Sequence, residues 1–246
     1  MEKNNPINKN YKNHEKMLVP AKKLPIAPHP KDWRHSFHWR IFRIMAEFVD
    51  GFQFLSDFKK TVTLFGSATF NETNHWYKVA RDLAQMLSQA GYSVVTGGGP
   101  GIMEAGNRGA VEGKNGDSIG LNIQLPYEQR TNRYVEKGHG FYYFFTRKVM
   151  MSFSAQAYVF FPGGYGTLDE AFELLVLIQT KKISGKIPVI LVGQEFWCDM
   201  DSWLRKTLLK EYQTIDPEDL KIYTIVNTAK EAFDIIRKTK PREEFR

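Results

Sequence analysis

The chain has 246 residues, which is the size of one large domain or of one domain with an appendage. Hydrophobic residues make up 42% and charged residues 25%, as in ordinary globular proteins. A single cysteine, Cys198, excludes an intramolecular disulfide framework and a cysteine-rich zinc site. No apolar run approaches the roughly 20 residues of a membrane-spanning helix, and the opening MEKNNPINKN lacks the apolar core of a secretory signal. We therefore expect a cytoplasmic protein.

The net charge of +7 lies almost entirely near the N-terminus. Residues 1–60 hold 12 Lys and Arg against 6 Asp and Glu, whereas residues 61–246 hold 22 against 21. Residues 1–34 are rich in Lys, Asn and Pro, which predicts a basic flexible arm before a single domain at 35–246. Such an arm can touch RNA, a membrane or an acidic partner. We favour a solubilising tail, and expect no nucleic-acid or membrane partner, because the arm carries no Arg-rich or aromatic-interleaved motif.

An amphipathic helix is predicted directly after the arm. Its apolar residues recur at spacings of three and four, and they are Phe37, Ile41, Ile44, Met45, Phe48, Val49 and Phe52. So many aromatic groups on one stripe could contact a ligand or a partner. Packing of the stripe against the chain's own domain is the interpretation we favour.

Short apolar strands then alternate with helices. Strands are predicted at 61–65, 92–96, 118–123, 157–161, 188–192 and 223–226, and helices at 75–90, 102–112, 147–154, 167–181, 195–211 and 229–238. Asn74 is the expected N-cap of the first of these helices, and Gly91 its stop. The alternation predicts an α/β fold with a Rossmann-like, doubly wound parallel sheet and helices on both faces. In such a sheet ligands bind where the loops after the strands converge.

Two of those loops are rich in glycine. The first is TGGGPGIMEA, which joins a strand to a helix and so offers backbone and a helix N-terminus to an anion. It is not a dinucleotide fingerprint, because the third glycine of G-x-G-x-x-G is missing, and G-x-x-x-x-G-K-[ST] occurs nowhere in the chain. More glycines are present than a tight turn needs, so we favour a loop that contacts a ligand.

The second loop is FPGGYGTLDE, whose amides could cradle a phosphate without a lysine. A competing interpretation is a capping box, with Thr167 as the helix N-cap and Glu170 reaching back to its amide. Two such loops at neighbouring strand ends point to a nucleoside monophosphate or a sugar phosphate as the ligand.

The motifs GGGPGIMEAGNRGA and PGGYGTLDE, with FFTRKVMM between them, resemble those of the Lonely guy (LOG) family of nucleotide phosphoribohydrolases, which are often labelled lysine decarboxylases. The resemblance covers about residues 37–238. It implies a Rossmann-like fold and hydrolysis of the N-glycosidic bond of nucleoside 5′-monophosphates, such as AMP or a cytokinin riboside monophosphate. The products are a free base and ribose 5-phosphate. No motif argues for a pyridoxal phosphate site.

The resemblance also implies roles for individual residues. The catalytic pair falls on Arg147 and Glu170. The phosphate-binding and substrate-binding positions fall on Ser67, Gly98, Gly99, Glu104, Lys148, Gly163, Gly164, Gly166 and Thr167. A surface pair with Arg108 is the default interpretation for Glu104, because the two are spaced i, i+4. Arg130 and Arg133 lie in a polar loop and either reach the phosphate or are solvated.

Cleavage of a glycosidic bond builds positive charge on the ribose, which a carboxylate such as Glu170 can stabilise. Glu170 could equally activate the water, whereas a guanidinium is a poor proton donor and Arg147 is expected to orient groups. We expect no metal and no cofactor, and a homodimer is implied by the resemblance. The alternative is a non-catalytic nucleotide carrier similar to molybdenum-cofactor carriers, which share the PGG-x-GT loop.

Overall fold

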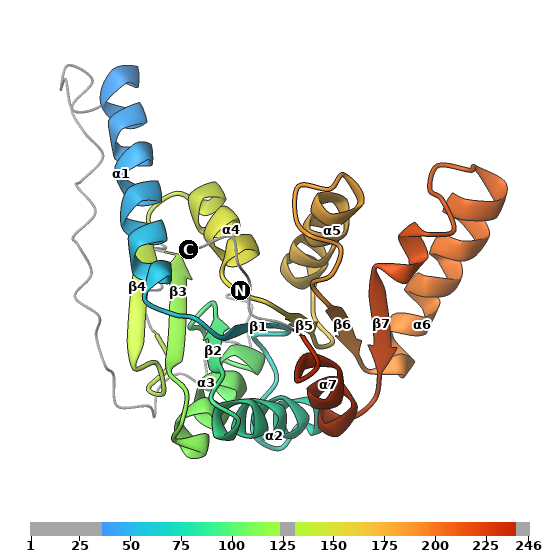
Figure 1. Ribbon diagram of the computed structural model, residues 1–246, viewed down its shortest axis with the longest axis horizontal. Coiled ribbons are helices and arrows are strands. Elements are labelled where there is room, and N and C mark those ends of the chain that lie inside the picture. The colour runs from blue at the N-terminus through green and yellow to red at the C-terminus, as the bar shows by residue number, and fades with distance from the viewer. Residues whose placement is uncertain (1–35, 124–130, 240–246) are drawn as a thin grey trace, which may run out of the picture.

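The computed structural model describes residues 36–123 and 131–239. The predicted arm at 1–34 and Arg130 lie outside these residues. The core is a seven-stranded, all-parallel sheet in the order β4-β3-β2-β1-β5-β6-β7 (Figure 1). Its strands are β1 (Thr61–Phe65), β2 (Ser93–Thr96), β3 (Ser118–Ile123), β4 (Lys137–Phe141), β5 (Tyr158–Phe160), β6 (Val189–Val192) and β7 (Tyr223–Val226). The predicted doubly wound sheet is confirmed.

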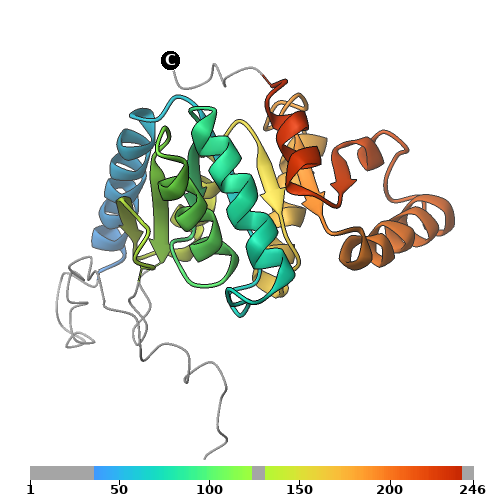
Figure 2. The ribbon, with the colours of Figure 1, turned by 90° about the horizontal axis from the view of Figure 1, so that it is seen from below.

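Helices cover both faces of the sheet. One layer consists of α2 (His75–Gln89), α3 (Ile102–Gly113) and α7 (Ala229–Ile236), and Figure 2 looks onto this layer, with α2 running between the other two. The opposite side carries α1 (Phe37–Ser56), α4 (Phe144–Phe153), α5 (Tyr165–Gln179) and α6 (Gln194–Trp203), which continues as a π-helix over Leu204–Glu211. None of the helices in the described ranges is long and apolar enough to cross a bilayer.

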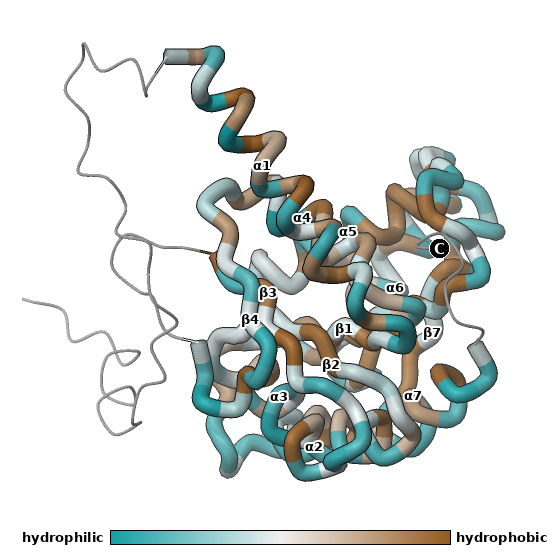
Figure 3. The backbone as a smooth tube through the Cα atoms, turned by 60° about the vertical axis from the view of Figure 1, so that its left-hand side comes forward, coloured by the Kyte–Doolittle hydropathy of each residue, from teal (hydrophilic) through white to brown (hydrophobic). Residues whose placement is uncertain are grey.

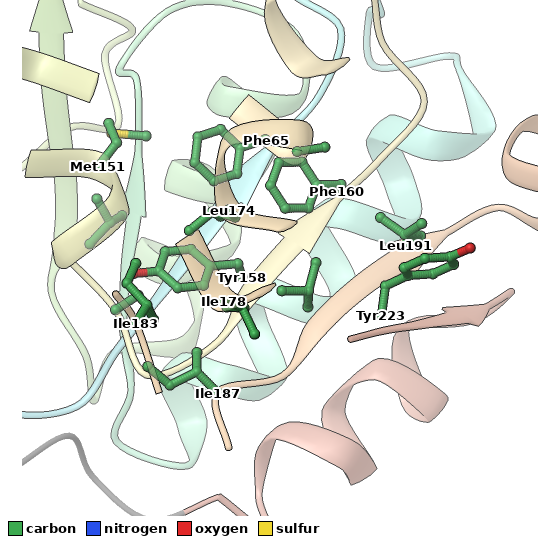
Figure 4. Packing of buried hydrophobic residues seen from close by; sticks show 14 of the residues in the cluster. Phe65, Met151, Tyr158, Phe160, Leu174, Ile178, Ile183, Ile187, Leu191 and Tyr223 are labelled. Atoms are coloured by element: carbon green, nitrogen blue, oxygen red, sulfur yellow. The ribbon is translucent and has the colours of Figure 1, made fainter. Parts of the chain in front are cut away.

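Each face of the sheet has its own apolar core. Strand residues alternate between the two, as the period of two along a strand requires. Val62 and Leu64 of β1 pack towards α2, while Phe65 stacks on Phe160 of β5 in the core under α5 (Figure 4). Because helices cover both sides, β1, β2, β5 and β6 are buried along their whole length; YVF of β5 and VILV of β6 are wholly apolar, while β1 and β2 also bury Thr and Ser side chains.

The predicted N-cap and stop of α2 are confirmed. Asn74 Oδ1 accepts from the amide of Trp76 at 2.8 Å, and Gly91 has a φ of +79°, which favours glycine. The sequence pattern missed β4, whose KGHGF has two glycines and is largely exposed as the edge strand of the sheet. Such a segment shows no apolar alternation.

The expected packing of the α1 stripe against the domain is confirmed only in part, because Ile44 and Phe48 are half-buried and Phe48 packs against the core, whereas the other members are exposed. The exposed fractions are 70% for Phe37, 55% for Met45 and 63% for Val49. Figure 3 shows the reason, since the first half of α1 stands clear of the other elements. The fully buried residues of α1 are Gly51 and Leu55, which lie seven residues after Ile44 and Phe48 and so share the half-buried edge of the stripe.

Candidate active site

The loop after β1 lies at the point where the strand order reverses, and backbone hydrogen bonds join it to both glycine-rich segments. From β1 the chain builds outward through β2 and β3 to β4, then returns so that β5 pairs with the other edge of β1. The loops after β1 and β5 therefore border the crevice in which doubly wound sheets bind their ligands. Backbone bonds join them, because the amide of Ser67 donates to the carbonyl of Pro162 at 3.0 Å. The carbonyl of Ser67 also accepts from the amide of Ile102 at 3.0 Å, which joins the loop after β1 to the first glycine loop.

The PGGYG loop leaves an open helix N-terminus. The structure corrects the capping-box interpretation, because α5 begins at Tyr165 with Gly164 as its N-cap, and no side chain caps it. Thr167 is thus in the third helical position. The amides of Tyr165, Gly166 and Thr167 lack intrahelical acceptors, as in the first turn of any α-helix, and carry its positive partial charge. This end of α5 is suited to bind a phosphate.

Glycine is required for space at Gly163. A Cβ added there would lie 2.1 Å from Thr167 Oγ1 and 3.0 Å from the amide nitrogen of Ser67. At Gly164 and Gly166, in contrast, an added Cβ would meet nothing within 4 Å. Gly163 therefore permits the loop to pack. Gly164 and Gly166 leave open space at the N-terminal end of α5.

Hydrogen bonds with Thr96 and Asn132 brace the first glycine loop. The amide of Gly98 donates to Thr96 Oγ1 at 2.9 Å, its carbonyl accepts from the amide of Asn132 at 2.8 Å, and Asn132 Nδ2 donates to the carbonyl of Gly99 at 2.9 Å. Gly98 has a φ of +69°. Because the amide of Gly98 and both carbonyls are already bonded, the predicted contacts of the two glycines to substrate would come from the amide of Gly99 or from their Cα surface.

A buried asparagine holds this arrangement. Asn107 of α3 is fully buried, and its side chain accepts from Thr96 Oγ1 at 2.6 Å and from Asn132 Nδ2 at 2.9 Å. Its own amide group donates to Ser118 Oγ at 2.9 Å and to the carbonyl of Ile119 at 3.1 Å. Sequence reasoning missed this residue, although a polar side chain on the apolar face of α3 was an available signal.

The predicted catalytic pair comes together from two helices. Arg147 Nη2 of α4 lies 3.5 Å from Glu170 Oε1 of α5, and the two side chains are 12% and 7% exposed. An added Cβ at Gly97 would lie 3.2 Å from Arg147 Nη1, so the guanidinium also touches the first glycine loop. Arg147 Nε is buried and has no hydrogen-bond partner among the described residues. It is a donor that a ligand can use.

Burial changes the acidity of both groups. Loss of solvation raises the pKa of Glu170 to about 7, although the positive charge of Arg147 acts in the opposite direction. Burial also lowers the pKa of Arg147, against the charge of Glu170. Glu170 can therefore take up and release a proton near neutral pH, as a general base must.

The other predicted residues take several positions. Ser67 Oγ lies 2.8 Å from Thr69 Oγ1 and accepts from the amide of Thr69, which shapes the loop after β1. Lys148 pairs with Asp169 at 2.8 Å and Glu173 at 3.4 Å, so its charge is balanced by carboxylates of α5.

Glu104 does not form the expected surface pair. It accepts from Tyr77 Oη at 3.2 Å, while Arg108 pairs with Glu72 at 2.9 Å and Glu112 at 3.0 Å. Arg133 Nη2 donates to Tyr134 Oη at 2.8 Å. The assignment of these groups to substrate binding stays a prediction.

Comparison with known proteins shows the family of the chain. The model of a family described as "Possible lysine decarboxylase" matches residues 103–236, more than half of the chain. A probable cytokinin riboside 5′-monophosphate phosphoribohydrolase of rice (Oryza sativa subsp. japonica) is 33% identical over 135 residues. The match covers 51% of this chain and 51% of that protein, so the chain spans about half the length of the relative it matches.

Solved structures share the fold. The molybdenum cofactor binding protein of Rippkaea orientalis has a TM-score of 0.56 at 20% identity, covering 73% of this chain and 96% of that one. The molybdenum cofactor carrier protein of Chlamydomonas reinhardtii has a TM-score of 0.54 at 18% identity, covering 73% and 97%.

Proposed function

Because the chain belongs to the LOG family, whose model is described as possible lysine decarboxylase, we propose that it is a phosphoribohydrolase of nucleoside 5′-monophosphates. The observation that carries this proposal is the buried Arg147–Glu170 pair, in which Glu170 belongs to α5, the helix whose open N-terminus is suited to a phosphate. Glu170 lies five residues after the start of α5, about 7.5 Å along its axis. That spacing is of the order of the reach from a 5′-phosphate to the ribose ring.

The proposed reaction uses water as the nucleophile. With the phosphate on the amides of α5, the ionised Glu170 takes a proton from a water molecule that adds to C1′ of the ribose. The C1′–N bond breaks, the base leaves with its electron pair and takes up a proton from solvent, and Glu170 then releases to solvent the proton it took from the water. The positive charge that develops on the ribose is stabilised by the carboxylate, while Arg147 orients Glu170 and donates from Nε to the substrate.

We propose an adenine-type base, as in AMP or a cytokinin riboside monophosphate. The printed name of the rice relative supports the latter. The second candidate is a nucleotide or cofactor carrier without catalysis. The molybdenum-cofactor proteins share its fold at about one-fifth identity, which carries no argument about ligand. A carrier has no need of a buried carboxyl that titrates near neutrality.

A homodimer is also part of the proposal. Large apolar side chains are exposed on the side of the molecule that carries α1, α4 and α5, and exposed apolar patches of this kind are typical of protein interfaces. They include Phe37, Phe42, Met45, Val49, Phe144, Phe145, Phe172 and Val176.

Release of free base from a panel of nucleoside 5′-monophosphates tests the function. The panel includes AMP and isopentenyladenosine monophosphate, with adenosine as the substrate that lacks the phosphate. We expect release from monophosphates only, and a loss of at least a hundredfold in Glu170→Gln and in Arg147→Ala. Glu195→Gln, an exposed carboxylate on α6, is the control. Bound nucleotide without any release of base would contradict the hydrolase and favour the carrier.

A further inference from the structure

We propose that Glu47 on α1 is a positioning residue that fixes the start of α4 and thereby places Arg147. The proposal rests on the proposed function for its activity readout, but its structural basis is separate. Helix α1 lies outside both glycine loops, and Glu47 precedes Arg147 by 100 positions in the sequence.

The carboxylate of Glu47 on α1 binds the start of α4. Its Oε1 accepts from the amide of Tyr142 at 2.6 Å, and its Oε2 accepts from the amide of Tyr143 at 3.2 Å and from Thr146 Oγ1 at 2.6 Å. Tyr143 is the N-cap residue of α4 and makes no side-chain cap bond of its own. A carboxylate here satisfies backbone donors and is stabilised by the helix dipole. One side chain therefore ties the two residues before α4 to the hydroxyl of Thr146 in its first turn.

Arg147 lies at the first turn of α4, which Glu47 holds through Thr146. The amide of Arg147 donates to the carbonyl of Tyr143 at 3.3 Å, and Thr146 is its direct neighbour. From this turn the guanidinium reaches Glu170 at 3.5 Å. A shift of the first turn of α4 thus moves Arg147 relative to Glu170 and to the first glycine loop.

Close packing fixes α1 against α4. Gly51 lies one turn after Glu47, and a Cβ added there would be 2.9 Å from Met150 Sδ of α4 and 3.0 Å from Phe141. Leu55, another turn on, is buried in the core. Glu47, Gly51 and Leu55 are spaced i, i+4, i+8 and so share one helix face. This face, together with Phe48 of the apolar stripe, holds α1 on the domain.

The test compares Glu47→Ala and Glu47→Gln with Asp50→Asn, a matched control. Asp50 is an exposed carboxylate on the same helix. We expect kcat for base release to fall about 10- to 100-fold in Glu47→Ala with KM changed less than about threefold, because misplacement by about 1 Å can cost this much. Glu47→Gln keeps one acceptor oxygen and is expected to retain part of the rate. Asp50→Asn is expected to match the wild type.

The pH profile separates positioning from general destabilisation. Glu170 is faced by Arg147 and Lys148 of α4 and by Asp169 and Glu173 of α5, and Arg147 is the group that lowers its pKa most. When Arg147 moves away, the acid limb of the rate profile moves to higher pH. We expect that shift in Glu47→Ala and not in Asp50→Asn.

Wild-type kcat and an unshifted profile in folded Glu47→Ala would overturn the proposal, as would a loss of rate without a shift of the acid limb. If Glu47→Ala does not fold, the same readouts on Glu47→Gln decide. If wild-type protein releases no base, the proposed function has failed, and the positioning role of Glu47 is tested by amide exchange alone. Amide exchange at Tyr142, Tyr143 and Arg147 must then accelerate at least tenfold in the Glu47 variants, and unchanged exchange would overturn the proposal.

Discussion

Alanine at two glycines of the same loop is expected to have opposite effects on stability. In Gly163→Ala the new Cβ meets Thr167 Oγ1 at 2.1 Å and the Ser67 amide at 3.0 Å. Thr167 is buried and β-branched, so it has little freedom to turn away. Overpacking of this kind costs about 1–3 kcal/mol in free energy of unfolding, which is a fall of about 3–10 °C in Tm for a chain of this size.

Gly166→Ala meets nothing within 4 Å and stands in the first turn of α5. Alanine is favoured over glycine in helices, so the free energy of unfolding is expected to rise by up to about 1 kcal/mol. The added methyl group lies where we place the phosphate, and KM for AMP is expected to rise at least tenfold, or about 1.4 kcal/mol.

Thermal melts and steady-state kinetics on both variants decide the matter. Gly164→Ala, which also has open space around its Cβ, serves as the second test of ligand space. A fall in Tm for Gly166→Ala would show that the glycine is kept for folding. An unchanged KM in both Gly164→Ala and Gly166→Ala would place the phosphate elsewhere.

Three further predictions concern the ionisation of Glu170, the hydrogen bonds by which Asn107 braces the first glycine loop, and the exposed apolar side chains. The rate constant kcat/KM is expected to fall about tenfold for each pH unit below the pKa of Glu170 at about 7, because the proton-accepting carboxylate must be ionised; a flat profile from pH 5 to 8 would contradict this. Asn107→Ala is expected to lose about 2–3 kcal/mol in urea unfolding, since Thr96 and Asn132 lose their shared acceptor; a loss below about 0.5 kcal/mol would contradict the brace. Phe42→Asp is expected to halve the mass measured by light scattering, whereas an unchanged mass would leave this surface without a role in the dimer.

The sequence predicted the parts of the molecule that depend on local pattern. Short, largely apolar stretches predicted the positions of the buried strands. The glycine loops predicted the end of the sheet at which we place the site. The start of α5 was misplaced, because Thr167 followed by Glu170 imitates a capping box while the true N-cap, Gly164, has no side chain to signal it.

Contacts between distant segments could not be predicted in this way. Glu47 meets the amides of Tyr142 and Tyr143 across 95 and 96 positions, and a single acidic residue on an amphipathic helix is ordinarily solvated. The same limit applies to the packing of α1. Its contact face uses Gly51, a residue that apolar periodicity cannot count.

The strand order has a consequence for how the molecule folds. Strand β1 lies between β2, about 30 residues further along the chain, and β5, about 95 residues further. As the chain is synthesised, β1 to β4 can pair while one edge of β1 waits for β5, with Phe65, which stacks on Phe160 of β5, and a row of backbone groups still uncovered. Unpaired apolar edges of this kind recruit other chains, so we expect a fragment ending near residue 150 to aggregate. The strand that covers this edge also brings in the PGGYG loop and α5, so the step that pairs the free edge of β1 is also the step that completes the proposed site.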